Sequence, residues 1–261
     1  MSMRPLSDWQ PRDIVGVFTD IDDTLTTEGA ITPDALQALG MLKAAGLHVV
    51  PITGRPVGWS EPFAKSWQVD AIVAENGAVA LVHADGRPLL KLYQQEADVR
   101  EDNFTRMQQV LSRIEREVPG AQRSQDSLGR ETDIAIDHSE FTHLPQAGID
   151  AVVHTMQSAG MSATVSSIHI NGWFGTHDKL AGAQWIVRKL WGRDLKAEID
   201  RWVYVGDSTN DQVMFRHFAH SIGVANIQRF AAHLSHPPAF ITPGERGAGF
   251  AQVVQVLLGA R

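Results

Sequence analysis

The sequence predicts an α/β protein with a Rossmann-like, doubly wound parallel-sheet core that carries a smaller inserted α/β unit. One observation is the repeated alternation of short β-branched runs with longer helical stretches, a pattern typical of a parallel sheet covered on both faces. A second observation is that three of these runs end in polar residues, namely Asp20, Thr53 and Asp207. Both features are typical of a sheet whose strand ends carry a binding site.

The bulk composition limits which functions the chain can have. Its 261 residues are 43% hydrophobic, enough to bury a substantial core. It contains no cysteine, which excludes disulfides, thiolate metal sites and cysteine nucleophiles. The net charge of −7 argues against a general nucleic-acid or membrane partner, because such partners favour a basic surface. The N-terminus shows no signal-peptide pattern and no run approaches about 20 apolar residues, so we expect a cytoplasmic protein, either a monomer or a small homo-oligomer.

The core elements follow from local patterns. Residues 32–46 predict a helix, with Thr32 as N-cap, Pro33 at the first helical position and Gly46 at the end. A last helix is expected at residues 250–258. The predicted strands are residues 14–19, 47–53, 71–74, 201–207 and 221–225.

The polar strand ends predict where ligands bind. In open parallel sheets, ligands bind outside the carboxyl ends of the strands, so Asp20, Thr53 and Asp207 should meet at one edge. Each has a purely structural explanation alone, since Asp is a common turn residue and Thr53 before Gly54 can form a simple turn. The convergence of all three favours a site.

The stretch FTDIDDTLTT places Asp20, Asp22 and Asp23 within four residues, where their charges repel unless a cation lies among them. Mg²⁺ prefers carboxylate and water oxygens and completes its shell with phosphate. We expect Asp20 and Asp207 to be carboxylate ligands. Asp22 would offer its backbone carbonyl, and Asp211 would bind directly or through water.

Four motifs occur in the order of those of the haloacid dehalogenase superfamily of phosphatases. They are DIDDT, TGR, a lysine before a helix at Lys179, and GDSTND. Roughly 125 residues separate Thr53 from Lys179, with ENGA (75–78) early in the gap. The chain therefore resembles the type-IIB branch, which includes Cof-like, sucrose-phosphatase-like and mannosyl-3-phosphoglycerate phosphatase-like proteins and has an α/β cap between the second and third motifs.

The resemblance implies a mechanism. Asp20 would attack phosphorus to form an aspartyl-phosphate, and Asp22 would act as the acid and then the base. Thr53 and the amide of Gly54 would hold phosphate oxygens, while Lys179 and Mg²⁺ would balance their charge.

Two further residues of the first motif have expected roles. Thr24, which we count among the substrate-binding residues, should orient the turn at Asp22. The family often has Gly where this chain has Asp23, and we expect that side chain to point to solvent.

The inserted segment is predicted at residues 90–172, with the core at 1–89 and 173–261. A hairpin turned at Asp85–Gly86 should lead out of the core. A second cap helix is expected at residues 148–160, and strands are expected at residues 132–137, 161–166 and 167–171. The cap would close over the site and bind the part of the substrate beyond the phosphate. One face of its first helix is expected to carry Phe104, Met107, Leu111, Ile114 and Val118.

The substrate is expected to be a small phosphorylated metabolite, and sugar phosphates are the commonest substrates of the branch that the chain resembles. A mannosyl-3-phosphoglycerate or sucrose-phosphate phosphatase is the main alternative. A phosphomutase would keep the same motifs, and a sugar-phosphate-binding regulatory module is the non-enzyme alternative. The HxxH pairs at residues 217–220 and 233–236 suggest surface histidines rather than zinc ligands. Candidate substrate contacts are Arg55, Arg123, Arg130, His138, His169 and Asn171.

Overall fold

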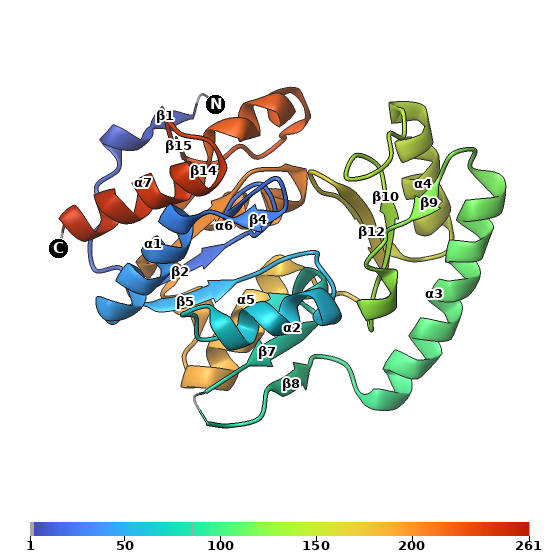
Figure 1. Ribbon diagram of the computed structural model, residues 1–261, viewed down its shortest axis with the longest axis horizontal. Coiled ribbons are helices and arrows are strands. Elements are labelled where there is room, and N and C mark those ends of the chain that lie inside the picture. The colour runs from blue at the N-terminus through green and yellow to red at the C-terminus, as the bar shows by residue number, and fades with distance from the viewer. Residues whose placement is uncertain (1–2, 85, 261) are drawn as a thin grey trace.

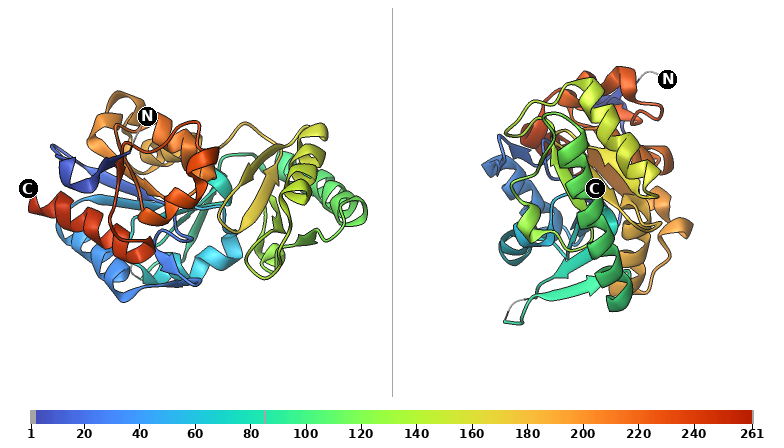
Figure 2. Two further views of the ribbon diagram at one scale, coloured as in Figure 1. Left: turned by 90° about the horizontal axis from the view of Figure 1, so that it is seen from above. Right: turned by 90° about the vertical axis from the view of Figure 1, so that its right-hand side faces the viewer.

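The computed structural model describes residues 3–84 and 86–260. Two bodies lie side by side in Figures 1 and 2, a larger one with the N- and C-terminal segments and a smaller one with α3, α4 and β9–β12. The predicted α/β fold is confirmed.

The core is built on a six-stranded sheet in which all neighbouring strands are parallel. Four of its strands were predicted, whereas β1 and β15, the two strands at one end of the sheet, have only two residues each and no sequence pattern of their own. The spatial order is β1 (Arg4–Pro5), β15 (Phe240–Ile241), β14 (His220–Gly223), β13 (Trp202–Gly206), β2 (Gly16–Thr19) and β5 (His48–Pro51).

Helices cover both faces of this sheet because its strands are apolar on both sides. Val17 packs in the cluster that includes α1 and α7, while the next residue, Phe18, packs in the cluster that includes α5 and α6. The predicted first helix is confirmed, with Pro33 at its start and Gly46 at φ +76° just after its end. Thr32 takes the N-cap position without a side-chain cap bond. The core helices are α1 (Pro33–Ala44), α2 (Val57–Ser66), α5 (Lys179–Trp191), α6 (Gln212–His217) and α7 (Arg246–Gly259).

A three-stranded antiparallel sheet extends the core beyond β5. It contains β6 (Ile72–Ala74), β7 (Val79–Val82) and β8 (Leu90–Tyr93), and one parallel bridge from Ile52 to Val73 links it to the main sheet. The predicted hairpin is β7–β8, and Asp85 of its turn lies outside the described residues. Because β8 pairs with β7, we propose that the cap begins after Tyr93 rather than at residue 90. A separate short hairpin joins β3 (Thr26–Thr27) to β4 (Ala30–Ile31).

The smaller body is a four-stranded antiparallel sheet with two helices against one face. Ile134 and Ile136 of β10 pack in the cluster with those helices, as the predicted alternation requires. The prediction that Phe104 lies on the buried face of the first helix is wrong, since it is 40% exposed. The elements are α3 (Ala97–Glu117), β9 (Gln122–Arg123), β10 (Ile134–Asp137), α4 (Gln146–Ser158), β11 (Ser162–Val165) and β12 (His169–Trp173).

The other face of this cap sheet is turned to the core. Asn171 of β12 alternates with Ile170 and donates to the backbone oxygen of Gly54, 3.2 Å away. The alternation of side chains along β12 therefore decides which polar cap side chains reach the core. None of the helices in residues 3–84 and 86–260 has the length and hydropathy required to span a bilayer.

Candidate active site

Three polar residues lie just beyond the carboxyl ends of neighbouring core strands. Asp20 follows β2, Asp207 follows β13 and Thr53 comes two residues after β5. Since β13, β2 and β5 are adjacent and parallel, these residues share one edge of the sheet. The predicted convergence is observed.

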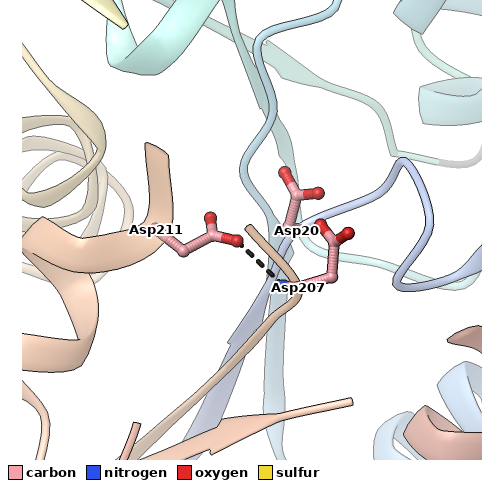
Figure 3. Close-up of side chains that lie close together, drawn as sticks. All are labelled: Asp20, Asp207 and Asp211. Atoms are coloured by element: carbon pink, nitrogen blue, oxygen red, sulfur yellow. Dashed lines mark hydrogen bonds between the residues drawn. The ribbon is translucent and has the colours of Figure 1, made fainter. Parts of the chain in front are cut away.

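Asp20, Asp207 and Asp211 form a buried acidic cluster (Figure 3). One carboxylate oxygen from each lies within 4.8 Å of the other two. Asp211 comes from the 3-10 turn η6 (Thr209–Asp211), and its side chain points back to the strand end of Asp207. Such a group of oxygen ligands suits a hard divalent cation.

Lys179 balances part of this negative charge. Its Nζ lies 2.7 Å from Oδ1 of Asp20 and 2.7 Å from Oδ1 of Asp211, and the side chain is buried. Burial alone would lower the pKa of Lys179, but the carboxylates of Asp20 and Asp211 raise it above its usual value. The lysine therefore stays protonated between two acids.

Two glycines allow α5 to approach the core closely enough to deliver Lys179. A Cβ at Gly77 would lie 2.3 Å from the backbone oxygen of Asp178, and one at Gly182 would lie 2.6 Å from Cα of Gly77. Gly77 also has φ +109°, a conformation that favours glycine. The ENGA stretch is thus a contact surface for α5, whose N-cap Asp178 accepts from the amide of Ala181.

Asp211 is fully hydrogen-bonded by the protein. Its Oδ1 accepts from Lys179 and from the hydroxyl of Tyr204, and its Oδ2 accepts from the amides of Asp207 (2.9 Å) and Ser208 (3.1 Å). A carboxylate with these four donors positions Lys179 and the turn after β13. The sequence left open whether Asp211 binds the metal directly or through water, and this arrangement favours the contact through water.

Asp207 differs, because only one of its oxygens has partners. Oδ2 accepts from Asn226 and Arg229, each at 3.2 Å, while Oδ1 is buried and has no hydrogen-bond partner within the described residues. Burial, with the charges of Asp20 and Asp211, raises the pKa of Asp207 well above its usual value. An orphaned, buried carboxylate oxygen next to Asp20 fits a cation ligand, so the side chains present suit Mg²⁺.

Asp22 contacts Arg55 instead of pointing freely into the site. Nε of Arg55 lies 3.0 Å from each carboxylate oxygen of Asp22. Thr53 supports this arrangement, since its Oγ1 accepts from the amide of Arg55 at 3.0 Å. The predicted acid–base residue is therefore held by the arginine of the TGR motif.

Arg55 also joins the core to the cap. Its guanidinium contacts Oδ2 of Asp126 at 3.2 Å and Oε1 of Glu140 at 2.6 Å, and both acids belong to the smaller body. Glu140 in turn lies 2.8 Å from Nε2 of His169. The cap is thus closed onto the core by a cluster of ion pairs around the buried guanidinium of Arg55.

The predicted cap residues are buried and bound to other protein groups. Arg130 pairs with Asp126 and Asp133 and donates to the backbone oxygen of Gly54 at 3.0 Å. Asn171 donates to Asp133 as well as to Gly54. Nε2 of His138 lies 3.0 Å from the backbone oxygen of Ser166, and burial lowers the pKa of this histidine. In this closed state Arg130 and Asn171 tie the cap to Gly54. The contact of His138 lies within the cap, and Arg123 pairs with Glu115 on the surface.

Of the two expectations for the first motif, the one for Asp23 is wrong, whereas the one for Thr24 stays a prediction. The hydroxyl of Thr24 is buried without a hydrogen-bond partner among the described residues, and Oγ1 of Thr26 accepts from the amide of Asp23 in its place. Asp23 does not point to solvent. Its carboxylate lies 2.7 Å from Arg229 and 3.0 Å from Arg246, although its φ of +55° is one that glycine adopts more easily.

A small cavity of about 10 Å³ lies between these groups. It is bordered by the proposed nucleophile Asp20, by Asp22 and Gly54, and by cap residues of β12 and the turn before it. A cavity of this size is just large enough to hold one water molecule. A phosphorylated substrate therefore requires the cap to open.

Several site residues could not be identified from their local sequence. Tyr204 donates to Asp211 and is buried. The sequence hints at this bond only by placing a Tyr hydroxyl within an apolar strand, where it needs a partner. Arg229, Asn226, Asp126 and Glu140 lie outside the recognised motifs.

Together, a doubly wound sheet, buried carboxylates at its strand ends and a closed cap define an α/β protein with a hydrolase-like site, in which the acidic cluster is a candidate cation site. The family model of haloacid dehalogenase-like hydrolases matches residues 17–105. The resemblance predicted from the motifs is thereby confirmed.

Solved structures show the same fold over almost the whole chain. A putative HAD/COF-like hydrolase from Plasmodium vivax aligns with TM-score 0.70 and 18% identity, covering 95% of this chain and 97% of that one. The sucrose-phosphatase from Synechocystis, in complex with sucrose and phosphate, aligns with TM-score 0.66 and 14% identity, covering 94% and 98%. A HAD subclass IIB sugar phosphatase aligns with TM-score 0.61 and 16% identity, covering 95% and 100%. No curated protein matches the sequence significantly.

Proposed function

We propose that the chain is a magnesium-dependent phosphomonoester hydrolase that acts on a small phosphorylated metabolite, a sugar phosphate, through an aspartyl-phosphate on Asp20. The observation that carries this proposal is the buried arrangement of Asp20 with Lys179 on one side and the unpartnered oxygen of Asp207 on the other. It offers a nucleophile, a fixed positive charge and a cation site at the same strand edge.

Asp20 is the nucleophile in this proposal because it borders the cavity and is held by Lys179. Burial raises the pKa of Asp20 to about 7, against the opposing effect of Lys179. A cation would lower that pKa and keep the carboxylate ionised for attack. Lys179 would hold the negative charge of the incoming phosphate.

The Mg²⁺ ion would be held by Asp20, Asp207 and the backbone carbonyl of Asp22, with Asp211 reaching it through water. When bound, Mg²⁺ would neutralise charge on the phosphoryl oxygens. Thr53 and Gly54 would hold the remaining oxygens, since both lie at the same strand edge.

Asp22 would serve as acid and base after it separates from Arg55. The ion pair with Arg55 keeps Asp22 away from substrate in the closed state. Opening of the cap would remove Asp126 and Glu140 from Arg55 and leave its guanidinium free to contact phosphate. Asp22 could then protonate the leaving oxygen and later activate water.

We place hydrolysis first and keep phosphoryl transfer to a second sugar as the alternative, because both reactions would use Asp20 and Lys179. A binding-only module would have no need for a nucleophile, a lysine and an orphaned carboxylate oxygen together. We place the activity in the cytoplasm, where a chain without cysteine is suited to reducing conditions.

Phosphate release from a panel of sugar phosphates, with Mg²⁺ and with chelator, tests the proposal. We expect release only with Mg²⁺ and none from Asp20→Asn. Turnover by Asp20→Asn close to that of the wild type, or full turnover in chelator, would show that the mechanism is wrong.

A further inference from the structure

The two carboxylate oxygens of Asp207 have different surroundings. Its Oδ1 is buried and has no hydrogen-bond partner among the described residues. Its Oδ2 accepts from Nδ2 of Asn226 and from Nη2 of Arg229, each at 3.2 Å. A carboxylate oxygen has two lone pairs, so these two donors use both lone pairs of Oδ2. The carboxylate lies beside that of Asp20 in Figure 3, and it can offer only Oδ1 to a cation there.

Arg229 is held on Asp207 by a second carboxylate. Its Nη2 lies 2.7 Å from Oδ2 of Asp23 and 3.2 Å from Oδ2 of Asp207, so one nitrogen bridges the two acids. The Arg229 side chain is 41% exposed, whereas that of Asp207 is fully buried. A single exposed ion pair orders a long arginine side chain poorly, but two acids on one nitrogen fix where it ends.

Asp23 is built into the site in an unusual backbone conformation. Its φ of +55° is uncommon for a residue with a side chain. Its amide donates to Oγ1 of Thr26 at 3.1 Å, and its carboxylate contacts both Arg229 and Arg246. A strained residue that is kept in place by its surroundings points to a role for its side chain. The contact with Arg229 supplies that role, because it carries over to Asp207.

The number of oxygens that a carboxylate can offer acts differently on Mg²⁺ and Ca²⁺. Mg²⁺ requires a nearly octahedral shell of few protein ligands, whereas Ca²⁺ accepts more oxygens and often takes both from one carboxylate. The two ions carry the same charge, so a nearby positive charge weakens the binding of both alike. A donor that occupies one oxygen of a ligand therefore penalises Ca²⁺ more than Mg²⁺.

We propose that Arg229, anchored by Asp23, is a positioning residue that withholds Oδ2 of Asp207 from the metal and so makes the site select Mg²⁺ over Ca²⁺. The inference rests on the proposed function, whose cation site it takes as given. It adds to that site a residue outside the recognised motifs and a role for Asp23. Arg229 acts through Asp207 and contacts neither the ion nor the substrate in this proposal.

The test measures the dissociation constants of Mg²⁺ and Ca²⁺ for the metal-free protein, from the rise in melting temperature with ion concentration. In Arg229→Ala, one lone pair of Oδ2 becomes available, and the ratio of the Ca²⁺ constant to the Mg²⁺ constant should fall about tenfold. Asp23→Asn, which removes the charge that anchors Arg229, should lower the ratio by a smaller factor.

Arg246→Ala is the matched control. Arg246 also pairs with Asp23, but in the described part of the chain it makes no ion pair with Asp207. Its loss removes the same charge as the loss of Arg229, so both ions should bind more tightly and the ratio should stay within about threefold of the wild type.

A ratio in Arg229→Ala equal to that of the wild type would overturn the proposal. So would an equal fall of the ratio in Arg246→Ala and Arg229→Ala, because the effect would then come from charge and not from a freed oxygen. An unchanged ratio in Asp23→Asn would overturn the role of Asp23 as the anchor. Failure of the proposed function gives a different result, since Mg²⁺ would then not raise the melting temperature of the wild type, and the inference would fall with it.

Discussion

Replacement of Asp20 by Asn should make the metal-free protein more stable while it abolishes turnover. Asp20 is buried, and burial raises its pKa from the ordinary 3.8 to about 7. The folded protein therefore binds a proton at Asp20 that the unfolded chain has released between about pH 4 and pH 7. Stability is lost as the pH rises through this window, and the loss is complete above pH 7.

The size of the effect follows from that difference. Each pKa unit corresponds to about 1.4 kcal/mol, so an ionised Asp20 costs the folded state about 4 kcal/mol at pH 8 without metal. Asn has the shape of the protonated acid and can still accept from Lys179. The free energy of unfolding of Asp20→Asn should thus exceed that of the wild type by about 4 kcal/mol at pH 8 and equal it near pH 4.

Urea unfolding in chelator at pH 4 and pH 8 measures this difference. Asp102→Asn, at an exposed carboxylate of α3, controls for the loss of one negative charge. The reasoning would be refuted if Asp20→Asn were no more stable than the wild type at pH 8. Added Mg²⁺ should stabilise the wild type and narrow the gap, because the ion binds the ionised carboxylate.

Three further predictions concern the neighbours of Asp20. Asp207→Ala should remove the rise in melting temperature that Mg²⁺ produces, since the unpartnered Oδ1 is lost; an undiminished rise would place the ion elsewhere. Asp22→Asn should lower kcat about 100-fold or more and change KM little, because general acid–base catalysis contributes about that factor; a change in KM alone would assign Asp22 to binding. Glu75→Ala should lower the free energy of unfolding in urea by about 3 kcal/mol and speed proteolysis at residues 131–132. The reason is that the buried Glu75 carboxylate accepts from the amides of both residues and from Thr132 Oγ1. Unchanged proteolysis would show that the cap is held without Glu75.

The positions of the core motifs were predictable because strand ends determine them. Asp20 and Asp207 had to meet once β2 and β13 were parallel neighbours, whatever the details of the loops. The contacts of Asp22, the second carboxylate of the DIDDT motif, were not predictable. Asp22 pairs with Arg55, and the same guanidinium also contacts Asp126 and Glu140, which are distant in sequence.

The cap shows the same limit. Alternation in β10 and β12 predicts which side chains share a face, but not what that face contacts. Arg130, His169 and Asn171 were candidates for substrate because they are polar, and the core and the neighbouring acids occupy them instead. A polar side chain becomes available to ligand only when the tertiary structure leaves it without a partner, and local sequence does not contain that information.

The contact between Gly77 and Gly182 has a consequence for how the protein can change. These glycines lie on opposite sides of the cap insertion in the sequence, and their backbones touch without any cap residue between them. The ends of the insertion are also tied together, since Nε2 of Gln95 donates to the backbone oxygen of Phe174 at 3.0 Å. The placement of Lys179 against Asp20 is therefore independent of the length of the insertion. Caps of other sizes could be exchanged at this junction, so new leaving groups could be accepted while the chemistry at phosphorus stays the same.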